Sequence, residues 1–347
     1  MDKLLLIDGN SIMNRAFYGL PLLSDSKGRY TNAVFGFLNI LFKTIDDESP
    51  THILVAFDSH APTFRHKTYE AYKGNRKGMP DELRSQMPLI REVLETMGIA
   101  TYIEEGIEAD DILGSLSLRF EKKGPVTVLS GDRDLLQLAS DQTKISIPRT
   151  KGGTTVTEHY DYKSFIETYG FTPTQFIDVK GMMGDSSDNI PGIPGVGEKT
   201  AHKYIQKYES LEGLYEHVDD LKGKTKEKVV DNKELAFISR DLATIKRDCS
   251  IEIEDEQMRL DNYLNEQTFD LFKELNFTRL LTRFDFNIME VANEVQSLEY
   301  SVIDAYATFI ETMKKEVKDQ RITFYHYQED GYLGLVVLLQ DKKKNYE

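Results

Sequence analysis

Short apolar runs in the first 190 residues repeatedly end at a carboxylate. LLLI leads into Asp8, VAF leads into Asp58, and VTVL is closely followed by Asp132. Such runs are typical of parallel strands that are buried on both faces of a sheet. The carboxyl ends of these strands are where open α/β sheets place their ligand crevice. The pattern therefore predicts a parallel sheet with acidic side chains gathered along one edge.

The acidic set is too large to be stable at one sheet edge without cations. Two carboxylates about 4 Å apart repel each other by roughly 1 kcal/mol in bulk water and by roughly 4 kcal/mol at an effective dielectric near 20. Hard oxygen ligands favour Mg²⁺ or Mn²⁺, and we expect two such ions. The candidate metal ligands are Asp8, Asp58, Glu108, Asp110, Asp111, Asp132, Asp134, Asp185 and Asp188.

Two divalent ions about 3.5 to 4 Å apart can activate a water and stabilise the leaving oxygen of a phosphodiester. Mg²⁺ takes only one or two carboxylates directly, so some of these acids are expected to act through water or to orient the others. Any single acid could instead cap a helix or form a turn. The complete set favours metal-dependent phosphodiester hydrolysis.

A glycine-rich turn, GIPGVGEKTA, spans residues 192–201. Two glycines around a hydrophobic residue, followed by a helix start, expose backbone N–H groups that can bind a phosphate without reading a base. This turn is similar to the hairpin of a helix-hairpin-helix DNA-binding element, and a plain turn between two helices is the alternative. The candidate DNA contacts are Gly192, Gly195, Val196, Gly197, Lys199 and Thr200.

A basic segment with interleaved aromatic residues, FRHKTYEAYKGNR, follows Asp58. Bases can stack on aromatic rings while cations meet phosphates, which holds a single strand without sequence preference. A solvated basic helix is the alternative. Lys73 and Arg76 are expected to contact the scissile phosphate and to offset its developing charge. The candidate DNA contacts of this segment are Arg65, Tyr69, Tyr72, Lys73 and Arg76.

The formal net charge of −15 would ordinarily argue against a nucleic-acid partner. Here the average conceals a basic segment beside an acidic cluster. No apolar stretch approaches the roughly 18 residues of a membrane span. The single cysteine, Cys249, cannot form an internal disulfide, so a reducing cytoplasm is expected.

Strand-like and helix-like segments alternate along the first half of the chain, which predicts an α/β fold. Beyond residue 192 we expect short helices to about residue 286, followed by strand-like runs at 322–327 and 333–339. Strands are expected at 3–7, 52–57, 100–103, 126–129, 144–147 and 154–156, the last two as a hairpin, and helices from near residue 12 and at 81–97, 162–169 and 174–183.

Taken together, these segments resemble the flap endonuclease family, and within it the 5′-nuclease domain of bacterial DNA polymerase I. The resemblance covers residues 1–288 and implies a PIN-like fold with a mostly parallel central sheet, a helical arch and a helical helix-hairpin-helix subdomain. It rests on LLLIDGN, VAFDS, FRHKTYEAYKGNR, GIEADDILG, VLSGDRDLLQL and KGMMGDSSDNIPGIPGVGEKTA.

The resemblance also implies a domain division and roles for the site residues. Residues 1–172 would form the catalytic α/β domain, 173–288 the helical DNA-binding subdomain, and 289–347 a partial 3′–5′ exonuclease-like domain. That last domain is expected to be inactive, because its first strand lacks an Asp-x-Glu pair. The acids from Asp8 to Asp111 would surround the first metal and those from Asp132 to Asp188 the second. The arch would pass a 5′ single strand, and the 192–201 hairpin would hold downstream duplex and bind K⁺.

The resulting hypothesis is a structure-selective 5′–3′ exonuclease and 5′-flap endonuclease that acts in Okazaki fragment processing and DNA repair. Its expected substrates are DNA with a 5′ flap, nicked or branched duplex, and RNA primer 5′ ends. We expect a monomer, without a membrane partner, in the bacterial cytoplasm near the nucleoid. Polymerase activity is not expected, since no polymerase motif is reached. A catalytically inactive branched-DNA-binding module and a PIN-like single-strand ribonuclease are the alternatives.

Overall fold

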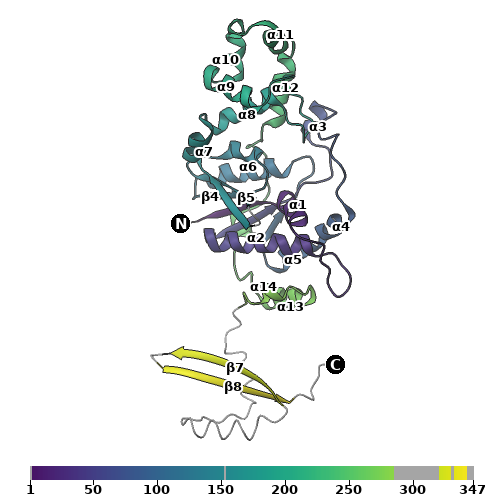
Figure 1. Cartoon of the computed structure of the whole chain (residues 1–347), viewed down its shortest axis with the longest axis vertical. Helices are drawn as coiled ribbons and strands as arrows, with labels where there is room; N and C mark the ends of the chain where they lie inside the picture. The colour runs from purple at the N-terminus through teal and green to yellow at the C-terminus, as the bar shows by residue number, and fades with distance from the viewer. Residues whose placement is uncertain (1, 152–153, 285–319, 330–331, 342–347) are drawn as a thin grey trace. The chain divides into compact units, whose positions relative to one another are not determined.

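The computed structural model of the chain describes residues 2–151, 154–284, 320–329 and 332–341. The chain divides into two compact units, Met1–Phe284 and Asp285–Glu347. The first unit contains a six-stranded sheet and its helices (Figure 1). In the second unit, β7 (Gln320–Glu329) and β8 (Tyr332–Asp341) pair as an antiparallel hairpin. The two strand-like runs expected there are therefore confirmed as strands.

The sheet of the first unit has the order β3-β2-β1-β4-β5-β6. Neighbouring strands from β3 to β5 run parallel, and β6 runs antiparallel to β5. The strands are β1 (Leu4–Asp8), β2 (His52–Ala56), β3 (Ala100–Tyr102), β4 (Val126–Leu129), β5 (Thr143–Lys151) and β6 (Thr154–Tyr160). Asp8 is in register with Ala56 of β2, and Ile7 with Leu129 of β4. The carboxyl ends of β2, β1 and β4 therefore lie side by side, as the acidic pattern predicted.

Burial on both faces explains the uninterrupted apolar sequence of these central strands. Every residue of β1, β2 and β4 is buried. Leu4 and Val128 belong to the same core cluster as Ile112 and Leu116 of α6. Parallel sheets covered on both faces need such strands, because neither face meets water.

The first unit has helices both before and after residue 170 of the chain. Before residue 170 they are α1 (Gly9–Gly19), α2 (Asn32–Glu48), α3 (Phe64–Thr68), α4 (Asp81–Arg84), α5 (Gln86–Thr96), α6 (Ala109–Phe120), η1 (Asp134–Leu138) and α7 (Tyr162–Tyr169). After it they are α8 (Pro173–Met183), α9 (Glu198–Tyr208), α10 (Leu211–Glu216), η2 (Val218–Asp220), α11 (Gly223–Asp231), α12 (Lys233–Ala243), η3 (Asp255–Met258), α13 (Glu266–Glu274) and α14 (Thr278–Leu281). None of the helices in the described ranges is long and apolar enough to cross a membrane.

Two helix starts differ from the prediction. The first helix begins at Gly9, directly after β1, because Asp8 is its N-cap and accepts a hydrogen bond from the Ser11 amide. The helix expected over residues 81–97 is divided between α4 and α5 at Ser85. Pro88 explains the division, since it has no N–H to donate to the carbonyl of Arg84 and its ring crowds that carbonyl.

An aromatic cluster joins α7 to α8. The ring of Phe165 is fully buried and lies 4.5 Å from the ring of Tyr169, centroid to centroid, and 5.9 Å from those of Phe171 and Phe176. Asp161 and Thr172 cap the two helices through capping boxes, which fix where each helix begins. The connection between the sheet and the following helices is therefore a packed core.

We expect Phe165→Ala to lower the free energy of unfolding by about 3–5 kcal/mol, because it removes a buried ring and leaves a cavity. Urea unfolding followed by circular dichroism measures the change. Tyr162→Ala on the same helix is the control, since Tyr162 is 39% exposed; its effect should stay within about 0.5 kcal/mol. Equal effects of the two substitutions would contradict this account of the core.

Candidate active site

Asp8 lies at the carboxyl end of β1, where it is buried and faces other acids. One of its oxygens accepts the Ser11 amide at 2.9 Å, and the other accepts the Ser130 hydroxyl at 2.8 Å. The same hydroxyl oxygen accepts the amide of Asp132 at 2.9 Å. Burial, together with the charges of Asp58 and Asp132, raises the pKa of Asp8 to about 7. Ser130, after β4, therefore links the Asp8 carboxylate at the end of β1 to the backbone of Asp132.

Asp58 and Asp110 complete this first group of acids. The Asp58 carboxylate accepts the amide of Ala109 at 2.8 Å, which ties the end of β2 to the start of α6. Asp110 is in the first turn of that helix. Burial raises the pKa of Asp110 well above its ordinary value, and the charges of Asp8, Asp132 and Asp58 add to the effect. Mutual repulsion of this kind marks a site that a cation would stabilise.

A second group lies around Asp134 and Asp185, with a lysine between them. The ammonium group of Lys180 contacts Asp134 and lies 2.6 Å from Asp185 Oδ2. Burial lowers the pKa of Lys180, but the two carboxylates more than offset this and raise it above its ordinary value. Burial and the charge of Asp132 raise the pKa of Asp134 to about 7. Asp132 therefore interacts with both groups, although the resemblance assigned it to the second metal alone.

The segment after α3 supplies cations to two further acids. Lys73 Nζ donates to Glu108 Oε2 at 2.9 Å, and the Arg76 guanidinium pairs with Asp188. Burial raises the pKa of Glu108, but Lys73 and the nearby Arg65 outweigh it and hold that pKa below its ordinary value. Both predicted catalytic cations therefore lie beside the acids.

Backbone contacts hold this segment against the loop that carries Asp188. Lys73 adopts a left-handed conformation with φ +55°, and its amide donates to the Asp188 carbonyl at 2.8 Å. Asn75 donates to the Ser186 carbonyl and Asn189 to the Ala71 carbonyl. A non-glycine residue is unfavourable in this conformation, so these contacts are what keep the Lys73 side chain at the acids.

Two glycines close the loop that presents Asp185 and Asp188. A Cβ atom on Gly184 would lie 2.4 Å from the Ile190 carbonyl oxygen, and one on Gly192 would lie 2.3 Å from the Gly184 nitrogen. Asp185 and Ile190 exchange backbone hydrogen bonds of 2.9 and 2.8 Å across the loop. The close backbone approach fixes both acids relative to α8.

Asp111 and Arg65 form a buried ion pair, which corrects two predictions. The Arg65 guanidinium donates to both oxygens of Asp111 at 2.8 Å, and both side chains are at most 3% exposed. Asp111 also accepts the amide of Lys246. Since both of its oxygens are occupied by the Arg65 guanidinium and one also by the Lys246 amide, we remove Asp111 from the candidate ligands. Arg65 is too buried to contact DNA.

Of the two tyrosines predicted to stack on bases, Tyr72 packs inward and Tyr69 is half-buried. Tyr72 is buried with Ile190 and Leu242, and Tyr69 packs against the same cluster. The Tyr72 hydroxyl lies 3.1 Å from Glu108 Oε2 and 3.3 Å from Asp188 Oδ2. The prediction that the Tyr72 ring stacks on a base is therefore wrong in this structure, whereas stacking on the half-buried Tyr69 stays a prediction. Spacing alone does not tell an inward-facing aromatic residue from an outward-facing one.

The 192–201 turn divides into a buried half and an exposed half. The Gly192 amide donates to the Ser239 hydroxyl at 2.9 Å, and the Val196 amide donates to the Ile193 carbonyl. Neither amide is available to a phosphate, which corrects both predicted contacts. Gly195, Gly197 and Lys199 are exposed at the start of α9, and Thr200 is half-buried there. The Thr200 amide donates to the Gly197 carbonyl at 2.9 Å, so the amides that can bind an anion are the earlier ones of the first turn, which lack intrahelical acceptors.

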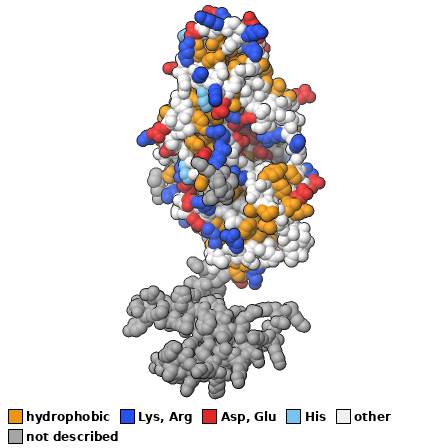
Figure 2. All heavy atoms as spheres, viewed as in Figure 1, with side chains coloured by type: hydrophobic (Ala, Val, Ile, Leu, Met, Phe, Trp, Pro, Cys, Tyr) orange, Lys and Arg blue, Asp and Glu red, His pale blue; other side chains and the backbone are white. Residues whose placement is uncertain are grey.

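The acids fit divalent ions that retain part of their water shell. Figure 2 shows acidic side chains within a hollow of the first unit, with Lys and Arg beside it. Within the described residues, no three Asp, Glu, His or Cys side chains lie close enough together to bind one ion directly. Mg²⁺ commonly uses one or two carboxylates and several waters. Asp8, Asp58, Asp110 and Asp132 have the donor chemistry for such an ion.

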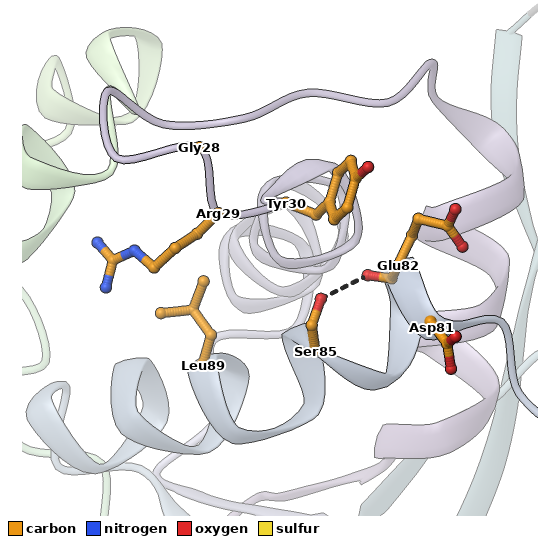
Figure 3. A pocket seen from close by; sticks show the side chains of 7 residues that line it. All are labelled: Gly28, Arg29, Tyr30, Asp81, Glu82, Ser85 and Leu89. Carbon is orange, nitrogen blue, oxygen red and sulfur yellow. Dashed lines mark hydrogen bonds between the residues drawn. The ribbon is translucent and has the colours of Figure 1, made fainter.

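A separate cavity of about 440 Å³ lies between the 28–30 segment and α4–α5 (Figure 3). Its lining residues are Gly28, Arg29, Tyr30, Asp81, Glu82, Ser85 and Leu89. None of the candidate ligands is among them. The site follows from the acids at the sheet edge and does not coincide with this cavity.

Two family models together match most of the chain. The model described as "5'-3' exonuclease, N-terminal resolvase-like domain" matches residues 3–170. The model described as "5'-3' exonuclease, C-terminal SAM fold" matches residues 171–266. The chain belongs to the 5′-3′ exonuclease family.

Curated relatives of this 5′-3′ exonuclease are much longer than the chain. DNA polymerase I of Bacillus subtilis is 46% identical over 342 residues, which cover 97% of the chain and 38% of the relative. DNA polymerase I of Bacillus caldotenax is 44% identical over 304 residues, which cover 87% of the chain and 34% of the relative. The chain thus spans little more than a third of these relatives, and no polymerase part is present in it.

Solved structures confirm the fold class. Zinc-bound T5 5′-exonuclease superposes with a TM-score of 0.58 at 21% identity, covering 79% of this chain and 99% of that one. A bacteriophage T5 flap endonuclease in a pseudo-enzyme-product complex with DNA and metal ions superposes with a TM-score of 0.55 at 20% identity. The match covers 84% of this chain and 99% of that one. The predicted PIN-like fold with a mostly parallel sheet and a helical C-terminal part is therefore correct.

Lys180 is the site residue of this 5′-3′ exonuclease that sequence reasoning missed. It lies in α8 between Val179 and Gly181, and its side chain is only 10% exposed. A lysine inside an otherwise apolar stretch, one turn before the GDSSD acids, was the available signal. A buried lysine requires a charge partner, and Asp185, five residues later, and Asp134 supply it.

The raised pKa of Asp8 predicts a pH-dependent effect of Asp8→Asn on stability. The folded-state pKa of about 7 lies above the ordinary 3.8, so the folded chain binds the extra proton between these values. The contribution of Asp8 to the free energy of unfolding therefore falls as pH rises from about 4 to about 7. Asn still caps α1. The free energy of unfolding of the variant, taken relative to wild type, should therefore be higher at pH 8 than at pH 5 by on the order of a few kcal/mol.

Urea unfolding at the two pH values, with a chelator present, measures this difference. Asp141→Asn is the control, since Asp141 is exposed. A stability difference between Asp8→Asn and wild type that is the same at pH 5 and pH 8 would show that Asp8 titrates normally.

Proposed function

We propose that this chain is a structure-selective 5′–3′ exonuclease and 5′-flap endonuclease that hydrolyses DNA phosphodiesters with two divalent ions. One observation carries the proposal. Four carboxylates, from Asp8, Asp58, Asp110 and Asp132, converge at the carboxyl edge of the sheet, where burial and the neighbouring acidic charges raise the pKa of Asp8 and of Asp110. Membership of the 5′-3′ exonuclease family and a fold shared with T5 5′-exonuclease support the assignment.

Divalent ions bound at these acids would activate water and stabilise the leaving oxygen. Mg²⁺ is our choice for the ion in the cell, since hard carboxylate oxygens suit it and it tolerates mixed ligation by carboxylate and water. The first ion would lie among Asp8, Asp58 and Asp110, bound directly by one or two of these carboxylates and through water by the rest. The second would lie beside Asp134 and Asp185, with Asp132 between the two ions. Glu108 and Asp188 would orient Lys73 and Arg76 from the side.

Lys73 and Arg76 provide positive charge next to the reacting phosphate in this proposal. Arg76 is 46% exposed, and Lys73 is 18% exposed beside Glu108. A cation aimed at developing charge stabilises the transition state more than the ground state. The exposed start of α9, with Lys199, would hold the backbone of the neighbouring duplex without reading sequence.

Further parts of the proposal rest on the family alone. The related proteins are named DNA polymerase I, so we propose flap and RNA-primer removal during Okazaki fragment processing and repair, in the bacterial cytoplasm near the nucleoid. We propose that the chain acts as a monomer and that the 192–201 hairpin binds K⁺. The division into residues 1–172, 173–288 and 289–347, with an inactive final part, also remains a proposal.

We expect Asp132→Ala and Asp185→Ala to abolish cleavage of a 5′-flap substrate with Mg²⁺, because each removes a proposed ligand. Gel analysis of a 5′-labelled flap measures the rate. Asp141→Ala, an exposed acid near the amino ends of β4 and β5, should retain the wild-type rate. Full activity in both site variants would contradict the two-ion mechanism.

We expect Lys73→Ala to reduce single-turnover cleavage by roughly 10²–10³-fold while changing duplex affinity little, since its charge acts on the transition state. Single-turnover kinetics and fluorescence anisotropy measure the two quantities separately. Lys67→Ala is the matched control, because Lys67 is an exposed lysine of the neighbouring α3. Equal losses in rate and affinity would mean that Lys73 serves binding rather than chemistry.

A catalytically inactive branched-DNA-binding module and a PIN-like single-strand ribonuclease remain the competing functions. Calorimetry that finds no divalent ion bound, with flap affinity retained, would favour the first. Faster cleavage of single-stranded RNA than of flap DNA would favour the second. The exposed glycines before α9 speak against the ribonuclease, since a single-strand ribonuclease does not need to bind duplex. The set of acids at the sheet edge speaks against the inactive module.

A further inference from the structure

Arg65 lies at a junction between the acid cluster and the helices that carry the glycine-rich hairpin. Its guanidinium donates to Asp111 of α6 through two bonds of 2.8 Å. It also donates to the main-chain carbonyls of Leu242 and Thr244, at the end of α12, through two further bonds of 2.8 Å. One side chain therefore connects α3, α6 and the end of α12.

Each end of this connection leads directly to a part of the proposed site. On one side, Asp111 follows Asp110 in the first turn of α6, and Arg65 lies 3.4 Å from Glu108 Oε2. On the other side, Ser239 of α12 accepts the Gly192 amide at the base of the hairpin. The hairpin is thus connected to the acids by hydrogen bonds through the end of α12 and the Arg65 side chain.

The packing around Arg65 leaves the junction little freedom. Leu242 and Ala243 are buried with Tyr72 in one apolar cluster. The Gln137 amide group donates to the Ala243 carbonyl, and its oxygen accepts the Ile245 amide. A Cβ on Gly114 of α6 would lie 2.7 Å from Ile245 Cγ2. The segment after α12 is therefore held by α6, η1 and the base of α3 together.

From this arrangement we propose that Arg65 is a positioning residue that sets which phosphodiester is cut. The inference rests on the proposed function. The hairpin holds the duplex, the acids mark the cut, and the Arg65 junction fixes the distance between them. Consecutive phosphates of one strand are about 3.4 Å apart along the duplex axis, so a displacement of that size at the junction moves the cut by one nucleotide. Arg65 itself contacts neither DNA nor metal.

Arg65→Lys tests this role, because lysine keeps the charge but cannot maintain the four directed bonds of the guanidinium. On a 5′-labelled flap, the variant should spread its products over neighbouring positions, whereas wild type yields one dominant product. The total rate should fall by no more than about 10²-fold. Asp111→Asn is a second variant on the opposite side of the junction, and it should spread the products in the same way.

Arg119→Lys is the matched control. Arg119 lies on the same helix α6 and also donates to two main-chain carbonyls, those of Ile251 and Ile253, and to Asp255. These hydrogen-bond partners all lie after α12 in the chain, and none of them belongs to α3 or α12. Arg119→Lys should keep a single dominant product. Equal spreading in Arg119→Lys and Arg65→Lys would show a general loss of rigidity and overturn the proposal.

A distance measurement separates this inference from the proposed function. Spin labels at Lys67→Cys on α3 and Glu227→Cys on α11, in the full chain with Cys249→Ser, report the separation of the two elements. The distance distribution should widen with Arg65→Lys and stay unchanged with Arg119→Lys. If wild type cuts no flap, the proposed function fails while the distances still test the junction. A wild-type product pattern in both Arg65→Lys and Asp111→Asn would overturn the role of Arg65.

Discussion

Repulsion among carboxylates at one edge of the sheet is the constraint on which the rest of the first unit depends. Parallel pairing of β2, β1 and β4 brings their carboxyl ends together, and so brings Asp8, Asp58 and Asp132 together. The strands cannot separate these charges, because their register is set by the buried core. The surrounding elements must therefore supply compensation.

Compensation comes from side chains outside the sheet, and this couples the helices to the acids. Lys180 of α8 lies between Asp134 and Asp185, and Lys73 reaches Glu108 from the segment after α3. Each cation contacts the acids of another element, so the same ion pairs that reduce repulsion also hold the fold together. The proposed catalytic cations are, for this reason, already near the place where a phosphate would react.

Chemically similar residues have different roles here because their burial differs. Asp110 and Asp111 are adjacent in α6, yet Asp110 faces the other acids while Asp111 is fully paired with Arg65. Arg65 and Arg76 come from one basic segment, but only Arg76 is substantially exposed. Breaking a buried ion pair leaves an uncompensated charge and is strongly destabilising, which suits Arg65 to a structural junction.

The sequence predicted the parallel sheet and the position of its acids well, since apolar runs that end in Asp report strand ends directly. It failed where the outcome depends on which way a side chain faces. Tyr72 lies among cations in the sequence as a stacking residue would, and only its packing against Leu242 and Ile190 shows that it points inward. Val196 lies in the predicted hairpin, but its side chain fills the core. Lys180 was missed because its partners come from two different loops.

Anomalous diffraction from crystals soaked in Mn²⁺ tests the central claim most directly, namely that the acids at the sheet edge form a two-ion site. We predict two peaks, one among Asp8, Asp58 and Asp110 and one beside Asp134 and Asp185, with Asp132 near both and Asp111 still paired with Arg65. Crystals without a peak at the sheet edge, or with Mn²⁺ bound by Asp111 in place of Arg65, would contradict the account.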